Sequence, residues 1–374
     1  MSTADLVNAM ESIAPLSLAE DWDNIGLLAG SGDWPATKVL LTIDLTAAVL
    51  QEAIDGGIQA IVSYHPPIFQ PLSRITDGDA RGSILLRALS ARIAIYSPHT
   101  ALDATDGGVN DWLADGVGGG ARRALRPWAN LPTAEACKLV TFCPQEVAGD
   151  VREALSSAGC GHIGGYDQCA FATPGTGTFR GGKGTTPAAG TAGELEEVAE
   201  VRLEMVASHA VLPDAIEVLR EAHPYEEPPI EVHSLAPRPR RDRGVGRRVV
   251  LEASAPLDEV ARRLKKHLGI GYVRVAPASG CDARGEITTI GLCAGAGGSL
   301  VSTAIDEGCE VYVTGEMRHH DVLAATAGGC AIITTGHTNS ERGFLPSLQQ
   351  QLTEALPGVE VMVSKSDAPP WTYF

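Results

Sequence analysis

The feature that most constrains the fold is a β-α-β rhythm that occurs near both ends of the chain. Residues 38–45 and 58–65 are short, mostly apolar runs separated by a helix-like stretch, and another helical stretch leads into residues 92–99. Short buried strands that alternate with helices predict a parallel sheet with helices on both faces. We therefore expect an α/β fold built from two halves. The strands expected in the second half are residues 287–293, 310–316, 330–337 and 359–365.

A different kind of sequence separates the two halves. Gly and Pro crowd residues 173–193, and a strand-helix-strand pattern follows across residues 197–235. These features predict an inserted α+β domain that carries a loop or a hairpin. The expected domains are residues 1–125 and 241–374 for the two α/β halves, which form one core, and residues 126–240 for the insert.

Charge and composition limit the partners and the compartment. The chain has 29 Lys plus Arg against 46 Asp plus Glu, a net charge of −17. Extended binding to nucleic acid or an anionic membrane needs a basic face, so neither partner is expected. The N-terminus has no signal-peptide pattern, and no apolar run approaches the roughly 18 residues of a membrane span, which predicts a cytoplasmic protein. The eight cysteines, Cys281 among them, include no Cys-x-x-Cys pair and are expected to be reduced core thiols.

Histidines and carboxylates gather where the predicted strands end. Ligands of open α/β sheets bind beyond the carboxyl ends of the strands, so polar residues at these positions are candidates for a site. Five of the ten histidines fall at or just after such ends, which random placement would rarely produce. The residues at these ends are His65, His99, Glu316 and His337, with His319 and His320 shortly after Glu316.

The spacing of these residues predicts metal ligation. His337 and Glu341 are four residues apart at a predicted helix start, where side chains at i and i+4 share a face. His99 and Asp103 have the same separation, in either a helix or a loop. Imidazoles with carboxylates suit divalent zinc, manganese or iron, and a pair of ions sharing Asp103 or Glu341 would activate water. The two α/β halves therefore form a metal-binding core, with His65, His99, Asp103, His337 and Glu341 as its expected ligands.

Several of these residues also have a purely structural interpretation. His65 and His337, each taken alone, are more typical of packing residues at strand ends than of ligands. One of His319 and His320 is expected to face the cleft, and the other to cap or pack the following helix. Asp44 either caps a helix or contributes to the site.

Three further segments leave two interpretations open. Residues 22–24 (WDN) form a structural turn or contact a ligand. Residues 295–298 (GAGG) allow tight strand-to-helix packing or contact a phosphate. The arginine-rich stretch 237–248 marks the return linker, either as a solvated hinge or as an anion-binding loop. Motifs of serine hydrolases, phosphate-loop NTPases and zincins do not occur, which argues against those classes.

Five segments, in this order along the chain, resemble one known family. They are WDNIGL (22–27), SYHPPIF (63–69), SPHTALDATDGGVNDWL (97–113), TGEMRHHD (314–321) and GHTNSERGFLP (336–346). By these segments the chain is identified as a member of the Ngg-interacting-factor-three family, whose members are also called GTP cyclohydrolase 1 type 2 homologs. The segment HPYEEP (223–228) resembles the insert of the longer bacterial members, which is similar to PII and CutA proteins and implies a ferredoxin-like topology.

The resemblance implies a particular site and assembly. It implies two divalent ions per subunit, zinc first with manganese or iron as alternatives, inside a ring-shaped homohexamer. Many members have two adjacent histidines, whereas this chain has Tyr64 before His65, a departure that concerns the second ion. The ligands that match the family are His65, Asp103, His337 and Glu341, with His99 close by.

The resemblance also implies a reaction. The family name implies attack of metal-activated water on C8 of the GTP purine, with Glu316 or His320 moving the proton. A broader hypothesis is hydrolysis of a nucleotide or another phosphorylated metabolite at the same ions. The alternative from another class is a non-enzymatic, metal-dependent hexameric regulatory or scaffold protein whose PII-like insert senses a small ligand.

Overall fold

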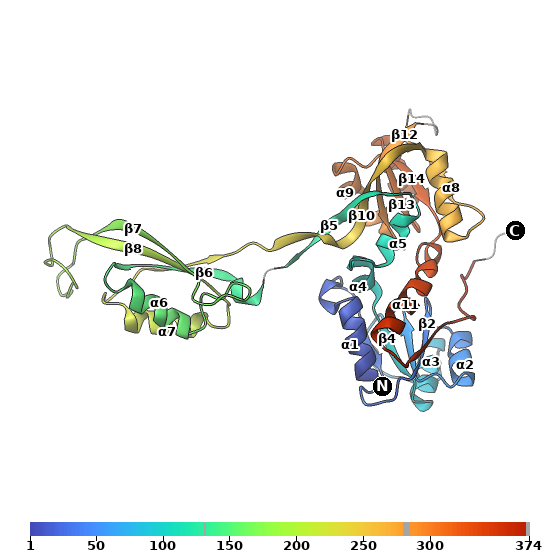
Figure 1. The fold of residues 1–374 in the computed structure, drawn as a ribbon, viewed down its shortest axis with the longest axis horizontal. Coiled ribbons are helices and arrows are strands. Elements are labelled where there is room, and N and C mark those ends of the chain that lie inside the picture. The colour runs from blue at the N-terminus through green and yellow to red at the C-terminus, as the bar shows by residue number, and fades with distance from the viewer. Residues whose placement is uncertain (131, 280–284, 372–374) are drawn as a thin grey trace. The chain divides into compact units, whose positions relative to one another are not determined.

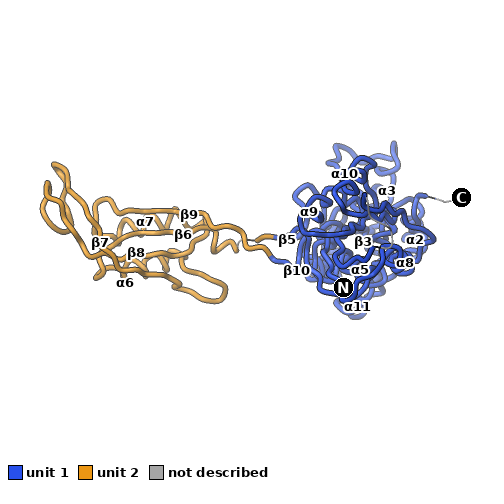
Figure 2. Tube along the Cα trace, turned by 90° about the horizontal axis from the view of Figure 1, so that it is seen from above, with its two compact units in different colours: residues 1–128, 240–374 blue, residues 129–239 orange. Residues whose placement is uncertain are grey.

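The chain forms two compact units in the computed structural model, which describes residues 1–130, 132–279 and 285–371. Unit 1 combines residues 1–128 with residues 240–374, and unit 2 comprises residues 129–239 (Figure 2). Unit 2 is therefore continuous in sequence and interrupts unit 1. Among the described helices, none has both the length and the apolar character that crossing a membrane requires. The seven described cysteines are all free, while Cys281 lies outside the described residues.

The first sheet of unit 1 has five strands in the order β1-β4-β3-β2-β15. Figure 1 labels β2 and β4 of this sheet. Four of the five strands run parallel, and β1 is antiparallel to β4. Every residue of β3 and β4 is buried, as expected for central strands covered on both faces. The strands are β1 (Gly26–Ala29), β2 (Lys38–Thr42), β3 (Ala60–Ser63), β4 (Ala94–Ser97) and β15 (Glu360–Val363).

Helices cover both faces of this sheet because successive residues of each strand point to opposite sides. Leu40 packs with α2 and α3 in one apolar cluster, whereas Val39 and Leu41 pack with α1 and α11 in another. Ser2 and Thr46 cap the starts of α1 and α2 with their side-chain oxygens. The helices are α1 (Thr3–Ile13), α2 (Ala47–Asp55), α3 (Ala80–Ser90), α4 (His99–Ala104), α5 (Val109–Asp115) and α11 (Leu345–Ala355).

The last predicted strand joins the N-terminal sheet rather than the C-terminal one. β15 pairs in parallel with β2, with Glu360 opposite Lys38 and Val363 opposite Leu41. The periodicity of residues 359–365 identifies a strand but carries no information about its neighbour. The two halves of unit 1 are therefore interleaved in sequence.

The second sheet of unit 1 has the order β11-β14-β13-β12-β10-β5. β12, β13 and β14 run parallel, and β10 and β11 are antiparallel to their neighbours β12 and β14. The strands are β5 (Gly120–Asn130), β10 (Arg238–Pro256), β11 (Arg274–Ala276), β12 (Glu286–Cys293), β13 (Val311–Thr314) and β14 (Ala331–Thr334). The helices of this half are α8 (Leu257–Leu268), α9 (Val301–Asp306) and α10 (His319–Ala327).

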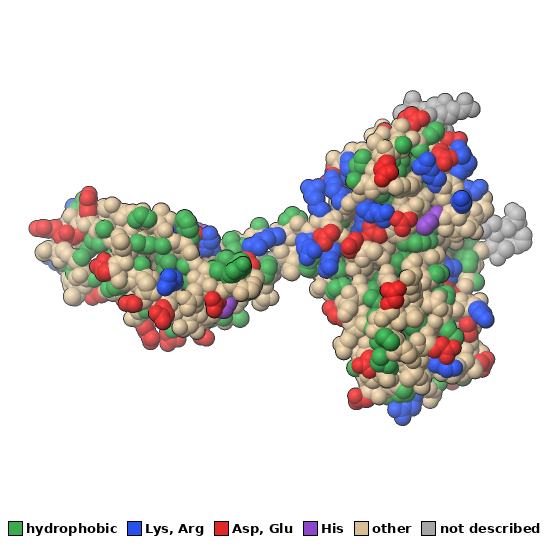
Figure 3. All heavy atoms as spheres, in the orientation of Figure 1, with side chains coloured by type: hydrophobic (Ala, Val, Ile, Leu, Met, Phe, Trp, Pro, Cys, Tyr) green, Lys and Arg blue, Asp and Glu red, His purple; other side chains and the backbone are tan. Residues whose placement is uncertain are grey.

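The arginine-rich stretch 237–248, predicted to be the return linker, does contain the return from unit 2 to unit 1, but its residues 238–248 form the first part of strand β10. Several of its arginines have partners within the chain: Arg240 pairs with Asp242, and the Arg248 Nε donates to the Glu307 carbonyl oxygen at 2.9 Å. Basic side chains over β5 and β10 are accordingly interspersed with acidic ones (Figure 3). Pairing with β5 and β12 satisfies the backbone of a segment whose composition resembles a linker.

One buried ion pair connects the two halves of unit 1. Arg247 on β10 is 1% exposed, and its Nε and Nη2 donate to the two Asp111 carboxylate oxygens on α5, each at 2.8 Å. The guanidinium also donates to the carbonyl oxygens of Thr105, Gly244 and Gly246. Gly246 adopts a positive φ of 64°, a conformation that favours glycine. A buried charge with all its donors used is a strong constraint on how the halves meet.

Unit 2 contains a four-stranded antiparallel sheet in the order β7-β8-β6-β9. Its elements follow each other as β-α-β-β-α-β, and both helices pack their apolar residues against the sheet in one core cluster. The elements are β6 (Cys137–Pro144), α6 (Ala148–Ser157), β7 (Ala170–Phe179), β8 (Glu196–Ala207), α7 (Leu212–Ala222) and β9 (Ile230–Ser234).

We expect Arg247→Met to destabilise unit 1 by about 3–5 kcal/mol, because it leaves the Asp111 carboxylate buried without its partner. All five tryptophans belong to unit 1, so tryptophan fluorescence during urea unfolding reports on this unit alone. The control is Arg262→Met, which removes an arginine side chain that is 64% exposed and should cost less than about 1 kcal/mol. Equal effects of the two substitutions would contradict the structural importance of the buried pair.

We also expect unit 1 to fold and bind metal without residues 129–239. The backbone of Gly244 on β10 lies against the backbone of Arg126 and Trp128 on β5. The deletion therefore leaves its two chain ends, Trp128 and Arg240, on neighbouring strands. A short Gly-Ser linker from Trp128 to Arg240 should close the gap, because loop closure over a few residues costs little. A variant that aggregates, or that no longer binds any divalent cation, would show that unit 2 is integral to the core.

Candidate metal centre

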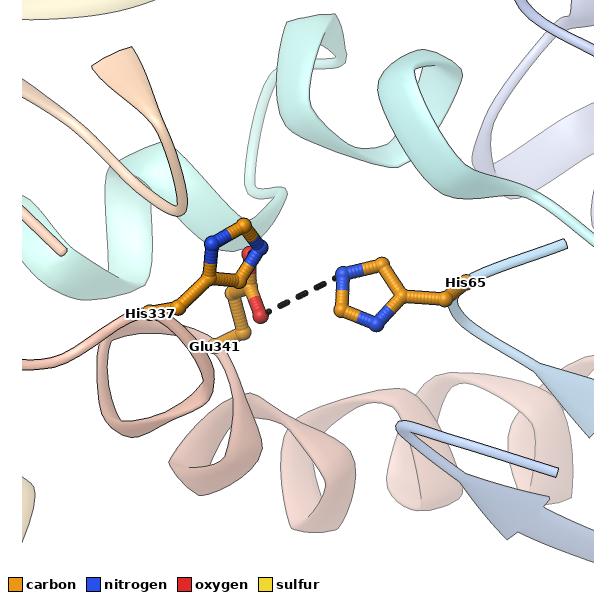
Figure 4. A group of neighbouring side chains, drawn as sticks. All are labelled: His65, His337 and Glu341. Atoms are coloured by element: carbon orange, nitrogen blue, oxygen red, sulfur yellow. Dashed lines mark ion pairs between the residues drawn. The ribbon is translucent and has the colours of Figure 1, made fainter. Parts of the chain in front are cut away.

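Three of the predicted ligands come together between the two halves of unit 1. The ligand atoms of His65, His337 and Glu341 all lie within 4.8 Å of one another. His65 follows β3 of the first sheet, and His337 follows β14 of the second sheet. Figure 4 shows the two imidazoles approaching the Glu341 carboxylate from different sides. The site thus needs both sheets to be in place.

The distances leave room for a cation between the three side chains. The His65 Nε2 lies 3.6 Å from the Glu341 Oε2, and the His337 Nε2 lies 3.6 Å from the Glu341 Oε1. Both separations exceed a normal hydrogen bond. Glu341 is 2% exposed, and its Oε2 has no hydrogen-bond partner among the described residues. A buried carboxylate oxygen in this position fits a metal ligand.

The expected helix start at His337 is wrong in type. His337 and Glu341 flank a 3-10 turn, η4 (Thr338–Ser340), and the following helix α11 begins at Leu345. The two side chains still meet, because the His337 Nε2 lies 3.6 Å from the Glu341 Oε1 across this turn. The Ser340 hydroxyl donates to the His337 carbonyl oxygen at 2.6 Å and fixes this turn.

A carboxylate holds the outer nitrogen of each imidazole. The His65 Nδ1 is 2.9 Å from Asp44 Oδ1, and the His337 Nδ1 is 3.0 Å from Glu316 Oε1. Metal-binding histidines commonly bond a carboxylate in this way, which orients the ring and increases its basicity. The free Nε2 atoms are therefore directed toward Glu341. The donor set and its supporting carboxylates fit a divalent cation.

The charges around His65 also fit a cation. Burial lowers the pKa of the His65 imidazole, but the hydrogen bond with Asp44 and the nearby negative charge of Glu341 outweigh it and raise the pKa to about 10. The surrounding carboxylates thus favour positive charge at this position, which a proton supplies when no metal does. A bound cation displaces that proton.

Asp103 and His99 lie beside these three residues in a separate hydrogen-bonded group. The Tyr64 hydroxyl donates to Asp103 Oδ1 at 2.6 Å. Burial raises the pKa of the Asp103 carboxyl to about 6, against the opposing effects of Tyr64 and His99. The His99 Nδ1 lies 2.7 Å from Asp23 Oδ1, and its ring centroid lies 5.5 Å from that of His65.

The two residues predicted to move a proton lie in different surroundings. Glu316 contacts the His337 imidazole, and its side chain is 60% exposed. His320 is exposed on α10, where its ring lies 5.5 Å from that of His319. Among the described residues, His320 is not part of the cavity wall at the metal centre.

A cavity of about 520 Å³ lies next to the candidate metal centre. His337 and Glu341 form part of its wall, together with Tyr64, His99 and Asp103. Its volume falls in the range that small-molecule ligands occupy. Further lining residues are Glu20, Trp22, Phe69, Arg126, Cys293 and Gly295–Gly297.

The sequence leaves the roles of two carboxylates at the site open, those of Asp44 and Asp23. Asp44 is not the helix cap, because the Thr46 side chain caps α2 and Asp44 contacts His65. Asp23, in the WDN turn, accepts from His99 and from the Thr100 hydroxyl. The position of Asp44 at the end of a strand indicates that it can reach the site. The contact of Asp23 with His99 depends on the folded position of the WDN turn, which local periodicity does not predict.

The whole chain is similar to known proteins. The family Duf34/NIF3 (NGG1p interacting factor 3) matches residues 1–370. A Halalkalibacterium halodurans protein named GTP cyclohydrolase 1 type 2 homolog is 34% identical over 371 residues, covering 98% of each chain. The human NIF3-like protein 1 is 32% identical, covering 99% of this chain and 92% of the human protein. The structure of a Bacillus cereus protein related to NIF3 superposes with a TM-score of 0.65 at 32% identity, covering 100% of this chain and 99% of that one.

We expect His337→Ala and Glu341→Ala each to weaken metal binding at least tenfold, because each removes one of three ligands. Isothermal titration with Zn²⁺ and elemental analysis would measure affinity and stoichiometry. His162→Ala, which truncates an exposed histidine in unit 2, is the matched control. Unchanged binding in both site variants would contradict the assignment of this metal centre.

Tyr64→His tests whether a second metal ion can bind. The Tyr64 hydroxyl donates a hydrogen bond to the Asp103 carboxylate, and burial raises the pKa of this phenol well above its usual value. An imidazole is a much better metal donor than such a phenol. We expect Tyr64→His to increase the number of bound ions, measured by elemental analysis after dialysis. A variant that binds the same number of ions as the unmodified chain would refute the idea that Tyr64 blocks a second ion.

Proposed function

The chain belongs to the Duf34/NIF3 family, and we propose that it is a metal-dependent hydrolase that acts on a nucleotide or a related phosphorylated metabolite. The family match confirms the membership that the sequence motifs indicated. The single observation that carries the proposal is a two-histidine, one-carboxylate set of which His337 and Glu341 line a cavity large enough for a metabolite. Relatives named GTP cyclohydrolase 1 type 2 homolog support the nucleotide as substrate.

The donor set supports the chemistry. His65, His337 and Glu341 would hold a divalent cation, for which we propose zinc, with manganese or iron as alternatives. A divalent cation bound there supplies Lewis acidity that polarises a substrate oxygen and acidifies water. Three protein ligands leave coordination positions for substrate and water, as in catalytic rather than structural sites.

The remaining polar residues position these ligands and handle protons. Asp44 and Glu316 orient the two imidazoles through hydrogen bonds to their Nδ1 atoms. Glu316 also reaches solvent, so we assign it the transfer of a proton between the cleft and bulk water. Proton transfer by His320 remains a prediction. This residue is exposed on α10.

A second ion, if bound, would lie on the side of His99 and Asp103. The family resemblance supports two ions per subunit, and Asp103 lies within the same cavity wall as Glu341. Binding there requires Asp103 to exchange the Tyr64 hydroxyl for the ion.

The assembly and the insert complete the proposal. The β-α-β-β-α-β order of unit 2 and its sheet order support a ferredoxin-like, PII-related insert in a core formed by residues 1–125 and 241–374. The family resemblance supports a ring-shaped homohexamer.

The test is turnover by metal-loaded protein across a panel of nucleotides and phosphorylated sugars. Formate release from GTP indicates ring opening at C8, and phosphate release indicates phosphoester hydrolysis. We expect turnover that stops on chelation, returns with the metal, and falls at least a hundredfold in His337→Ala. Metal-dependent binding of these compounds without turnover would overturn the hydrolase and support the regulatory protein instead.

A further inference from the structure

Two exposed aromatic side chains stand at the cavity that contains the metal centre. Trp22 is 59% exposed and Phe69 is 40% exposed, and both line the cavity that Glu341 also lines. Their ring centroids lie 6.0 Å apart with an interplanar angle of 56°. Large apolar groups left exposed beside a polar site are typical of a binding surface.

The turn that carries Trp22 is held firmly in place. The adjacent Asp23 side chain is fully buried and accepts hydrogen bonds from His99 Nδ1 at 2.7 Å and from the Thr100 backbone N–H at 3.1 Å. The next residue, Asn24, donates to the carbonyl oxygen of Ile68, the residue before Phe69. These bonds tie the two aromatic segments to each other and to the start of α4. The exposure of Trp22 is therefore a fixed feature of the fold.

The arrangement selects a ligand with a flat ring. An indole and a phenyl ring offer π faces on which a planar heterocycle stacks, and such stacking tolerates different bases. The T-shaped contact between Trp22 and His99, with ring centroids 6.1 Å apart, brings this surface next to the metal centre. Arg126 lines the same cavity with a side chain that is 50% exposed, and its guanidinium pairs with the Glu20 carboxylate, which also lines the cavity.

We propose that Trp22 and Phe69 form an aromatic clamp that binds the heterocyclic base of a nucleotide, with its phosphate-bearing part extending into the cavity toward the metal ligands. The inference rests on the proposed function and narrows its substrate class from phosphorylated metabolites to those that carry a flat base. It assigns to Trp22 a role in substrate specificity, separate from the role of Asp23 in positioning His99.

The experiment compares ligands with and without a base on the full-length, metal-loaded protein. GMP, AMP, CMP, UMP and ribose 5-phosphate would be titrated by calorimetry and by tryptophan fluorescence. We expect at least one nucleotide to quench the fluorescence and to bind at least tenfold more tightly than ribose 5-phosphate. Trp22→Ala should remove that advantage, and Trp22→Phe should retain most of it, because stacking requires an aromatic face and not an indole.

The controls separate the clamp from a structural role. Tyr166→Ala truncates an aromatic side chain of unit 2 that is 76% exposed, and should change no affinity. Metal content and ribose 5-phosphate affinity should be the same in Trp22→Ala as in the unmodified chain. Equal loss for GMP and ribose 5-phosphate, no nucleotide binding, or unchanged nucleotide binding in Trp22→Ala would each overturn the clamp.

Further outcomes separate the clamp from an oligomer contact and from the hydrolase activity. A change in oligomer size with Trp22→Ala, and no change in base preference, would overturn the clamp and show that the aromatic pair is a contact between copies of the chain. Base-dependent binding without turnover would support the clamp and refute the hydrolase. Turnover of a phosphorylated sugar that Trp22→Ala leaves intact would support the hydrolase and refute the clamp.

Discussion

The buried pair of Arg247 and Asp111 is the interaction on which the arrangement of unit 1 depends. It joins β10 of the second sheet to α5, which follows β4 of the first sheet and the short helix α4. The preceding residue in α5 also connects the two halves. The Asn110 side chain accepts a hydrogen bond from the Ala294 N–H and donates one to the Asp103 carbonyl oxygen. A desolvated guanidinium tolerates little displacement of its acceptors. This geometry holds the sheet that carries His65 against the sheet that carries His337.

That junction explains why the metal ligands lie where they do. Parallel strands direct their carboxyl ends to one edge of each sheet, and bringing two such edges together collects His65 and His337 around one buried carboxylate, Glu341. Asp44 and Glu316 then determine which imidazole nitrogen faces inward. The surrounding negative charge, visible in the raised pKa of His65, stabilises a cation at the centre.

Local patterns in the sequence are sufficient for the parallel strands and for three candidate ligands. Apolar runs separated by helical stretches predict these strands, and histidines at their ends predict a metal centre where the ligand atoms of His65, His337 and Glu341 lie close together. What such patterns do not reveal is long-range pairing: β15 joins the first sheet, and the arginine-rich stretch is a strand because β5 and β12 satisfy its backbone. The hydrogen bond from Tyr64 to Asp103 likewise joins residues 39 positions apart, which no local pattern encodes. Long-range partners are set by tertiary packing rather than by propensity.

The most direct test of the central claim is anomalous diffraction at the zinc edge from crystals of the protein grown with Zn²⁺. The structure predicts an anomalous peak between the two sheets of unit 1, about 2.0–2.2 Å from the Nε2 atoms of His65 and His337 and from a Glu341 carboxylate oxygen. A peak bound by other residues, or crystals in which these three side chains bind no ion at saturating zinc, would contradict the account.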